Sequence, residues 1–290
     1  MTALASSNDA PVAVICGGGT LPAEVVEAAR ATGREVLAIA IKGEAAAALE
    51  RFEPISLGWG QIGKLFDTMK KAGCHDVVLI GGVTRRPDFR SVAGDLGTLR
   101  RLPRIIAALT GGDDSLLVKV IGIFEDEGFR VIGAHEIAPS LLAGPGAIVG
   151  PEPAGEAVAD MQLARQAVEA LGRLDIGQAA VALGGRVIAV EGAEGTDAML
   201  ERCAELRRIG RVNAKGRIGV LVKRAKPGQD LRADLPTIGP KTIEAAAQAG
   251  LAGIALEAGR VFIAERDATL AAARDKGLFL HGFKGELDGA

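Results

Sequence analysis

Apolar residues in the first half of the chain occur in short β-branched runs, and each run is followed by a stretch with helical spacing. The expected strands are 12–16, 35–41, 77–80 and 129–132. The expected helices are 21–31, 61–72, 97–109 and 113–127, with a helix or turn at 45–51. This alternation of strand and helix predicts a parallel sheet covered by helices, in a Rossmann-like arrangement.

The pattern changes after residues 138–156, which are rich in proline and glycine and therefore typical of a stiff linker. Two apolar runs around Gly184-Gly185 predict a β-hairpin, and 253–256 with 261–264 form a second hairpin-like pair. Further helices are expected at 157–171, 196–209, 240–249 and 267–276, and further strands at 218–222 and near 278. We therefore expect a Rossmann-like domain at 1–137, a linker at 138–156 and a mixed α/β domain at 157–290.

Composition narrows the range of partners. Aromatic residues make up 3% of the chain and the net charge is −2, so neither base stacking nor charge favours a nucleic-acid partner. The three cysteines, at 16, 74 and 203, lack metal-binding spacing. We expect Cys16 and Cys74 to act as small apolar groups, and a reducing cytoplasm fits the cysteine pattern. No apolar run reaches the roughly 18 residues of a spanning helix, and the first residues do not resemble a signal peptide.

A long loop dense in charge, residues 223–239, separates the strand expected at 218–222 from the helix at 240–249. It reads KRAKPGQDLRADLPTIG, and we call it the motif loop. Its prolines stiffen it and its glycines allow tight bends. A stiffened polar loop after a buried strand is a frequent location for functional side chains. The alternative interpretation is a solvated loop, with Asp230 and Arg232 as a surface ion pair and Asp234 starting a turn.

Two glycine runs follow expected strands of the first domain: Gly17, Gly18 and Gly19 after 12–16, and Gly81 and Gly82 after 77–80. A strand, a glycine turn and a helix start can present backbone N–H groups to an anion. Both runs should lie at the carboxyl edge of the sheet, where ligands of open parallel sheets bind. The spacing differs from the dinucleotide-binding fingerprint. A tight turn without a ligand is the alternative.

The run from Gln229 to Thr242, QDLRADLPTIGPKT, resembles the UDP-2,3-diacylglucosamine pyrophosphatases of the LpxI type. Other matching stretches are CGGG at 16–19 with Leu21-Pro22, GDDSLL at 112–117 and GLAGIALEAG at 250–259. The resemblance implies magnesium-dependent hydrolysis of UDP-2,3-diacylglucosamine to UMP and 2,3-diacylglucosamine 1-phosphate (lipid X), in lipid A biosynthesis. It also implies that the first domain is a lid, that the second is catalytic, and that the substrate is a lipid-linked UDP-sugar. We expect a cytoplasmic location, and peripheral contact with the inner membrane and a homodimer are left open.

Pyrophosphate hydrolysis requires an activated water and neutralised phosphate oxygens, which carboxylate-bound magnesium can supply. The expected catalytic residues are Asp234, Asp230 and Arg232, and the expected Mg²⁺ ligands are Asp234, Asp230 and Asp197. The expected substrate-binding residues are Gly17, Gly18, Gly19, Gly81, Gly82, Thr196, Lys223, Gln229 and Thr237. Glu191 and the pair Asp113-Asp114 are weaker carboxylate candidates, and Thr196 or Asp197 could instead cap a helix.

Two other function classes remain compatible with these residues. One is a non-catalytic sugar-nucleotide binding protein. The other is a nucleotide-dependent ligase or transferase, which is weakened because no glycine-rich hairpin with a lysine is evident. Release of UMP from the lipid substrate distinguishes a pyrophosphatase from both.

Overall fold

The computed structural model describes residues 10–83, 97–98, 113–213, 215–232 and 234–285. Most of the helix expected at 97–109 lies outside these residues. The chain forms two compact units. The first comprises Met1–Pro139 with Asp230–Asp234, and the second comprises Ser140–Gln229 with Leu235–Ala290. Five residues of the motif loop therefore group with the first unit.

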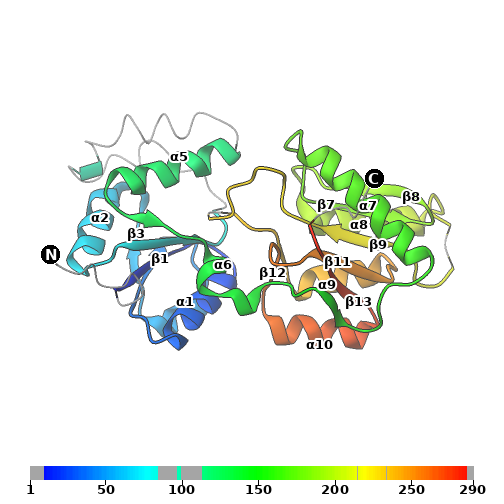
Figure 1. Cartoon of the computed structure of the whole chain (residues 1–290), viewed down its shortest axis with the longest axis horizontal. Helices are drawn as coiled ribbons and strands as arrows, with labels where there is room; N and C mark the ends of the chain where they lie inside the picture. The colour runs from blue at the N-terminus through cyan, green and yellow to red at the C-terminus, as the bar shows by residue number, and fades with distance from the viewer. Residues whose placement is uncertain (1–9, 84–96, 99–112, 214, 233, 286–290) are drawn as a thin grey trace. The chain divides into compact units, whose positions relative to one another are not determined.

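A five-stranded parallel sheet forms the centre of the first unit, in the order β3-β2-β1-β4-β5 (Figure 1). Its strands are β1 (Val12–Cys16), β2 (Val36–Ile41), β3 (Ile55–Leu57), β4 (Asp76–Ile80) and β5 (Arg130–Val131). Its helices are α1 (Leu21–Ala31), α2 (Ile62–Lys71), α5 (Asp113–Asp126) and α6 (Ala134–Ile137), with 3₁₀ turns η1 (Ala47–Phe52) and η2 (Trp59–Gln61). The predicted parallel sheet is confirmed.

Alternate strand residues of the first unit face opposite helix layers, as the two-residue period of a strand requires. Ala13, Ile15 and Ile39 pack with Phe66 of α2 and Phe124 of α5. On the other face, α1 buries Leu21, Val25, Val26 and Ala29. Helices α1 and α5 thus cover opposite faces of the sheet (Figure 1).

A six-stranded mixed sheet forms the centre of the second unit, in the order β6-β13-β11-β9-β7-β8. Its strands are β6 (Gly146–Val149), β7 (Ala179–Leu183), β8 (Arg186–Val190), β9 (Val220–Lys223), β11 (Gly253–Glu257) and β13 (Phe279–Phe283). Strands β9, β11 and β13 are mutually parallel, and β6, β7 and β8 pair antiparallel with their neighbours. Strand β6 falls within the stretch expected as a linker.

One hairpin prediction is confirmed and the other is wrong. Strands β7 and β8 pair antiparallel on either side of Gly184-Gly185, as expected. Strand β11 instead pairs in parallel with β9 and β13. The short strand β12 (Phe262–Ile263) pairs in parallel with β10 (Thr237–Ile238), which lies near the end of the motif loop. Every residue of β11 is buried, which suits a central parallel strand better than a hairpin arm.

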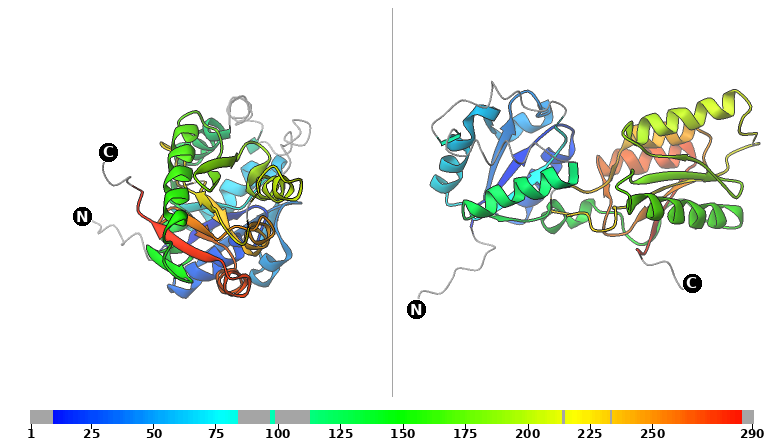
Figure 2. Two further views of the ribbon diagram at one scale, coloured as in Figure 1. Left: turned by 90° about the vertical axis from the view of Figure 1, so that its right-hand side faces the viewer. Right: turned by 90° about the horizontal axis from the view of Figure 1, so that it is seen from above.

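Helices cover both faces of the second sheet (Figure 1; Figure 2). Helix α7 (Glu156–Gly172) packs on one face, where Met161 and Val168 contact Val220 and Val222. Helices α8 (Gly195–Arg208), α9 (Pro240–Gln248) and α10 (Arg266–Lys276) cover the other face. No helix in the described parts of the chain has the length and apolarity needed to cross a bilayer.

Candidate functional site

The candidate site lies at one edge of the sheet in the second unit. Strand β9 ends there at Lys223, and parallel β11 ends there at Glu257. Strand β7 begins at this edge because Ala179 pairs with Lys223, and β8 ends there at Val190. The motif loop leaves the sheet at the same edge. Three segments therefore lie next to one another at this edge, although they are distant in sequence: the one after β8, the one before β7 and the one after β9.

A chain of buried hydrogen bonds runs along this edge. Lys223 Nζ donates to Thr196 Oγ1 at 2.6 Å, and Thr196 Oγ1 donates to Glu191 Oε1 at 2.7 Å. The other carboxylate oxygen of Glu191 accepts the backbone N–H of Gln178 at 2.9 Å. Lys223, Thr196 and Glu191 are 7%, 7% and 8% exposed, so these hydrogen bonds stabilise polar groups that water hardly reaches.

Gln229 joins this chain from the motif loop. Its Oε1 accepts hydrogen bonds from Gln178 Nε2 at 3.3 Å and from the backbone N–H of Lys226 at 3.0 Å. The structure therefore brings together three predicted site residues, Lys223, Thr196 and Gln229. It adds Gln178, which sequence reasoning missed because a glutamine before a strand carries no local signal.

Glu257 fixes the start of the motif loop. It is 1% exposed, and its carboxylate accepts the backbone N–H of Ala225 at 3.1 Å. The guanidinium of Arg224 lies 3.5 Å from Glu257 and 3.2 Å from Glu169 of α7. Sequence reasoning missed Glu257, although an acid that ends a wholly apolar strand is a usable signal.

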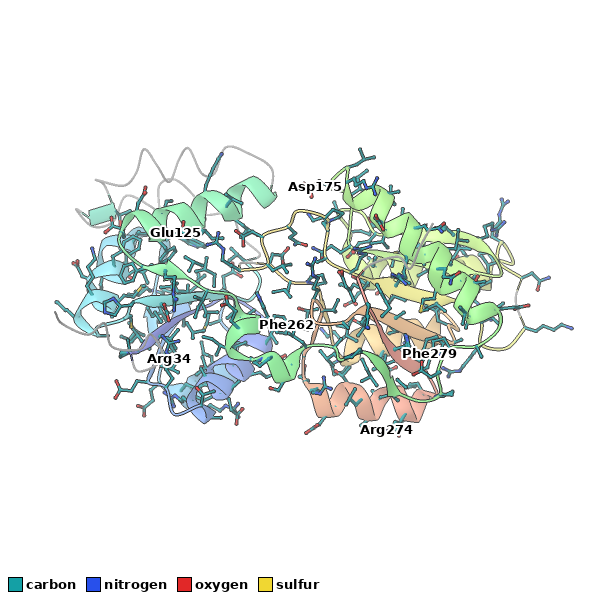
Figure 3. The ribbon with its side chains drawn as sticks, viewed as in Figure 1. Arg34, Glu125, Asp175, Phe262, Arg274 and Phe279 are labelled. Atoms are coloured by element: carbon teal, nitrogen blue, oxygen red, sulfur yellow. The ribbon has the colours of Figure 1, made fainter. Side chains whose placement is uncertain are left out.

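The loop after α7 is attached to the motif loop as well. Asp175 lies in this loop (Figure 3) and forms an ion pair with Lys226 of the motif loop. Gly172, the last residue of α7, leaves no room for a side chain, because a Cβ there would lie 2.8 Å from Pro227 Cδ. The first turn of the motif loop is thus fixed by both neighbouring strands and by the loop after α7.

Asp230 and Arg232 form a forked ion pair. Arg232 Nε and a terminal nitrogen donate to the two Asp230 oxygens at 3.0 and 2.7 Å, and the Arg232 backbone N–H donates to Oδ1 at 3.0 Å. These hydrogen bonds from Arg232 lower the pKa of Asp230 below its usual range. Arg232 also donates to Glu125 of α5 at 2.8 Å.

Asp234 is half-buried and lies just before a segment whose backbone is fixed by hydrogen bonds to β12. The Phe262 N–H donates to the Pro236 carbonyl at 2.8 Å, and Thr237 pairs with Phe262 in the β10–β12 ladder. Thr237 Oγ1 donates to the Leu235 carbonyl at 3.2 Å. The backbone C-terminal to Asp234 is therefore held in one path.

Asp197 lies in the first turn of α8 and accepts a hydrogen bond from Thr242 of α9 at 3.3 Å. Among the residues that the structure describes, no three His, Cys, Asp or Glu side chains are close enough to hold a metal ion. The assignment of Asp234, Asp230 and Asp197 as Mg²⁺ ligands therefore stays a prediction. Mg²⁺ is usually held by one or two carboxylates together with substrate oxygens, which a single acid of this loop can supply. The side chains of Asp113 and Asp114 lie outside the described part.

The two glycine runs of the first unit pack against each other. The Gly17 N–H donates to the Ile80 carbonyl at 2.9 Å, and Gly18 and Gly82 exchange two backbone hydrogen bonds of 2.7 and 3.1 Å. A Cβ on Gly17 would lie 2.5 Å from the Gly82 oxygen, and one on Gly81 would lie 2.7 Å from the Gly18 oxygen. Close backbone approach alone explains glycine at 17 and 81. The binding of substrate here stays a prediction.

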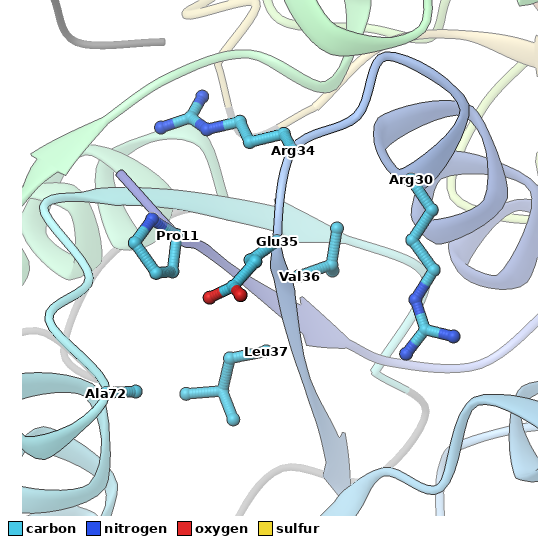
Figure 4. A pocket seen from close by; sticks show the side chains of 7 residues that line it. All are labelled: Pro11, Arg30, Arg34, Glu35, Val36, Leu37 and Ala72. Carbon is cyan, nitrogen blue, oxygen red and sulfur yellow. The ribbon is translucent and has the colours of Figure 1, made fainter. Parts of the chain in front are cut away.

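A separate pocket of about 390 Å³ lies in the first unit at the edge where β2 begins (Figure 4). It is lined by Pro11, Arg30, Arg34, Glu35, Val36, Leu37 and Ala72. The glycine runs follow the opposite ends of β1 and β4, and none of the predicted site residues lines this pocket.

Comparison with known proteins matches both parts of the chain to one family. Residues 11–141 match the LpxI N-terminal domain, and residues 144–281 match the LpxI C-terminal domain. The chain is 45% identical over 269 residues to the UDP-2,3-diacylglucosamine pyrophosphatase LpxI of Caulobacter vibrioides. That similarity covers 93% of this chain and 96% of the relative.

Proposed function

Since the chain belongs to the LpxI family, we propose that it hydrolyses UDP-2,3-diacylglucosamine to UMP and 2,3-diacylglucosamine 1-phosphate, a step of lipid A biosynthesis. Its class as a pyrophosphatase, and thus a hydrolase, follows from its 45% identity to a curated pyrophosphatase. The observation that carries the specific reaction is the motif loop, which starts at a buried lysine and is fixed by Glu257 and Gln229.

The reaction adds a water oxygen to one of the two phosphorus atoms and breaks the bridging P–O bond. The bridging oxygen leaves with the electron pair, and the proton of the water is released or transferred to a base. Negative charge on the phosphate oxygens must be neutralised for this to be fast. We assign that task to the ammonium of Lys223 and the guanidinium of Arg232, which can contact two oxygens at once.

We assign Asp234 as the carboxylate that acts at the reacting phosphate. Anchoring of Pro236 and Thr237 supports this choice, because a carboxylate beside a fixed backbone can be held in one orientation. Asp234 would also hold Mg²⁺ together with substrate oxygens, and the bound ion would neutralise charge and acidify a water. Asp230 is already paired with Arg232, so we assign it the orientation of that guanidinium.

A direct assay tests this proposal. Purified protein is incubated with UDP-2,3-diacylglucosamine, with magnesium and with a chelator, and UMP is quantified. We expect UMP release that depends on magnesium, and much slower release from UDP-glucosamine without acyl chains, because each buried methylene contributes about 0.8 kcal/mol. Binding without UMP release would instead indicate a non-catalytic sugar-nucleotide binding protein. Equal turnover of both substrates would contradict lipid specificity.

Replacing Asp234 with alanine should lower kcat by roughly 10³-fold or more, because the carboxylate acts at the reacting phosphate. Thermal unfolding should change little, since Asp234 is only half-buried. The control is Asp267→Ala, which removes an exposed acid from the first turn of α10. A D234A enzyme with normal kcat and normal magnesium dependence would overturn the assignment.

A further inference from the structure

The chemistry proposed above gives Glu191 no direct role, yet this residue is buried close to residues that have one. It is 8% exposed and lies directly after β8, at the sheet edge where the motif loop begins. We infer that Glu191 is a positioning residue that acts through the Thr196 hydroxyl on the ammonium of Lys223. This inference rests on the proposed function, because it assumes that Lys223 contacts the pyrophosphate.

The donors and acceptors fix the direction of every hydrogen bond in this chain. A lysine ammonium has only donors, so Lys223 donates to Thr196 Oγ1 at 2.6 Å. The hydroxyl of Thr196 has a single proton, and that proton goes to Glu191 Oε1 at 2.7 Å. Glu191 accepts on both oxygens, since Oε2 receives the Gln178 N–H at 2.9 Å. The carboxylate therefore orients the hydroxyl so that a lone pair faces Lys223.

Charge and burial support the same assignment. Lys223 and Glu191 carry opposite formal charges, and both are more than nine-tenths buried. A buried charge is costly unless it has a partner of opposite sign or several hydrogen bonds. Thr196 joins the two groups and is itself 7% exposed. Glu191 thereby provides a negative charge that is linked to the ammonium through the Thr196 hydroxyl, at the sheet edge from which the motif loop departs.

Glutamine at 191 is a sharp test because it preserves shape but not acceptor capacity. An amide has one acceptor oxygen and one NH₂ group, so it cannot accept from both Thr196 and the Gln178 N–H. Valine at 196 keeps the branched shape and removes the hydroxyl, whereas serine keeps the hydroxyl. If Glu191 acts through the Thr196 hydroxyl, kcat/KM should fall in Glu191→Gln and in Thr196→Val. Thr196→Ser keeps the hydroxyl and should retain activity.

We expect Glu191→Gln and Thr196→Val each to lower kcat/KM roughly tenfold, as for loss of one hydrogen bond to a charged group. Thr196→Ser should stay within about threefold of wild type, and Lys223→Met should lose roughly a hundredfold or more. The decisive measurement is the double-mutant cycle. If Glu191 acts only through Lys223, adding Glu191→Gln to Lys223→Met should cause no further loss. If the turnover of Lys223→Met is too low to measure, the same double-mutant cycle can be carried out on the affinity for UDP, measured by calorimetry.

Thr269→Val is the matched control. Thr269 is fully buried in the second unit and donates to the Ala264 carbonyl at 2.6 Å, and it takes no part in the hydrogen bonds that link Glu191, Thr196 and Lys223. The Thr269→Val variant should have a lower unfolding temperature than the wild type and an unchanged kcat/KM in its folded state. Additive losses in the cycle, or wild-type kcat/KM for Glu191→Gln and Thr196→Val, would overturn the inference. Failure of the wild-type protein to release UMP would overturn the proposed function instead, and the UDP-binding cycle would still test the link to Lys223.

Discussion

Asp76 shows how a buried acid can serve stability alone. It lies at the start of β4, is 2% exposed, and is held by Arg34 at 2.5 Å and Arg130 at 2.8 Å. Asp160 has a comparable task, since its carboxylate accepts the N–H groups of Gly184 and Gly185 at 3.0 and 2.7 Å and so closes the β7–β8 hairpin. Neither acid lies at the carboxyl end of a parallel strand, where Glu257 lies.

Replacing Asp76 with asparagine should destabilise the first unit by about 3 kcal/mol at pH 7, because two arginines lose their counter-charge. Burial raises the pKa of Asp76, but the hydrogen bonds and charges of Arg130 and Arg34 outweigh burial and lower it overall. Its stabilising effect is therefore complete above the unfolded-state pKa of about 4 and is lost as pH falls through the lower folded-state pKa. Urea unfolding of both proteins from pH 7 to pH 3 should show the difference shrinking with acid. A difference that is constant across this range would contradict the charge argument.

The cysteines illustrate what composition predicts well at this scale. Cys16 and Cys74 are free and buried, as expected, and Cys203 is free and buried as well. Burial raises the pKa of Cys16 to about 12 and the pKa values of Cys74 and Cys203 to about 11. Few thiolates form at neutral pH, so these side chains act as small apolar groups.

The structure brings together some of the predicted site residues, those for which a residue type and its place in the chain carried a signal, and their roles stay predictions. Lys223 ends a buried strand and Thr196 opens a helix, and the fold joins them. Gln178 and Glu257 could not be found in this way, because their roles depend on neighbours in other elements. The sequence left open whether Asp230 and Arg232 pair with each other, and in the structure they form a forked ion pair.

At the scale of elements, local signals predicted strands and helices better than strand partners. The Gly184-Gly185 turn forces two short runs to pair, so β7 and β8 were predictable. The similar turn signal near Gly259 misled, because β11 is buried on both faces and β12 pairs with β10. Strand pairing here is decided by burial across the whole sheet, which no short window of sequence contains.

The contact between the glycine runs gives a test at this scale. Gly17→Ala should destabilise the protein by about 2 kcal/mol or more, because its Cβ would lie 2.5 Å from a backbone oxygen that cannot move freely. Gly82→Ala is the control, since nothing lies within 4 Å of a Cβ there. It should change the free energy of unfolding by less than about 1 kcal/mol. Equal effects of both changes in urea unfolding would refute close backbone approach as the reason for Gly17.

For the molecule as a whole, the main observation is that each unit has its own core. Strands of the first sheet come only from residues 12–131, and strands of the second come only from residues 146–283. The apolar clusters on the two faces of the second sheet contain only residues beyond 140. A unit with a complete sheet and two covered faces meets the requirement for folding alone.

A fragment of residues 140–290 should therefore fold without the first unit. We expect native-like circular dichroism and one cooperative thermal transition, because every strand pair and both helix layers of this unit are retained. Leu221→Ala in the fragment is the control, since Leu221 is fully buried in β9 and its truncation should cost about 2–5 kcal/mol and lower the transition temperature. The fragment lacks the glycine runs, so its UMP release should be much slower than that of the whole chain if those runs bind substrate as predicted. An unfolded fragment would show that the second core depends on the first unit, and full turnover by the fragment would exclude the glycine runs from the reaction.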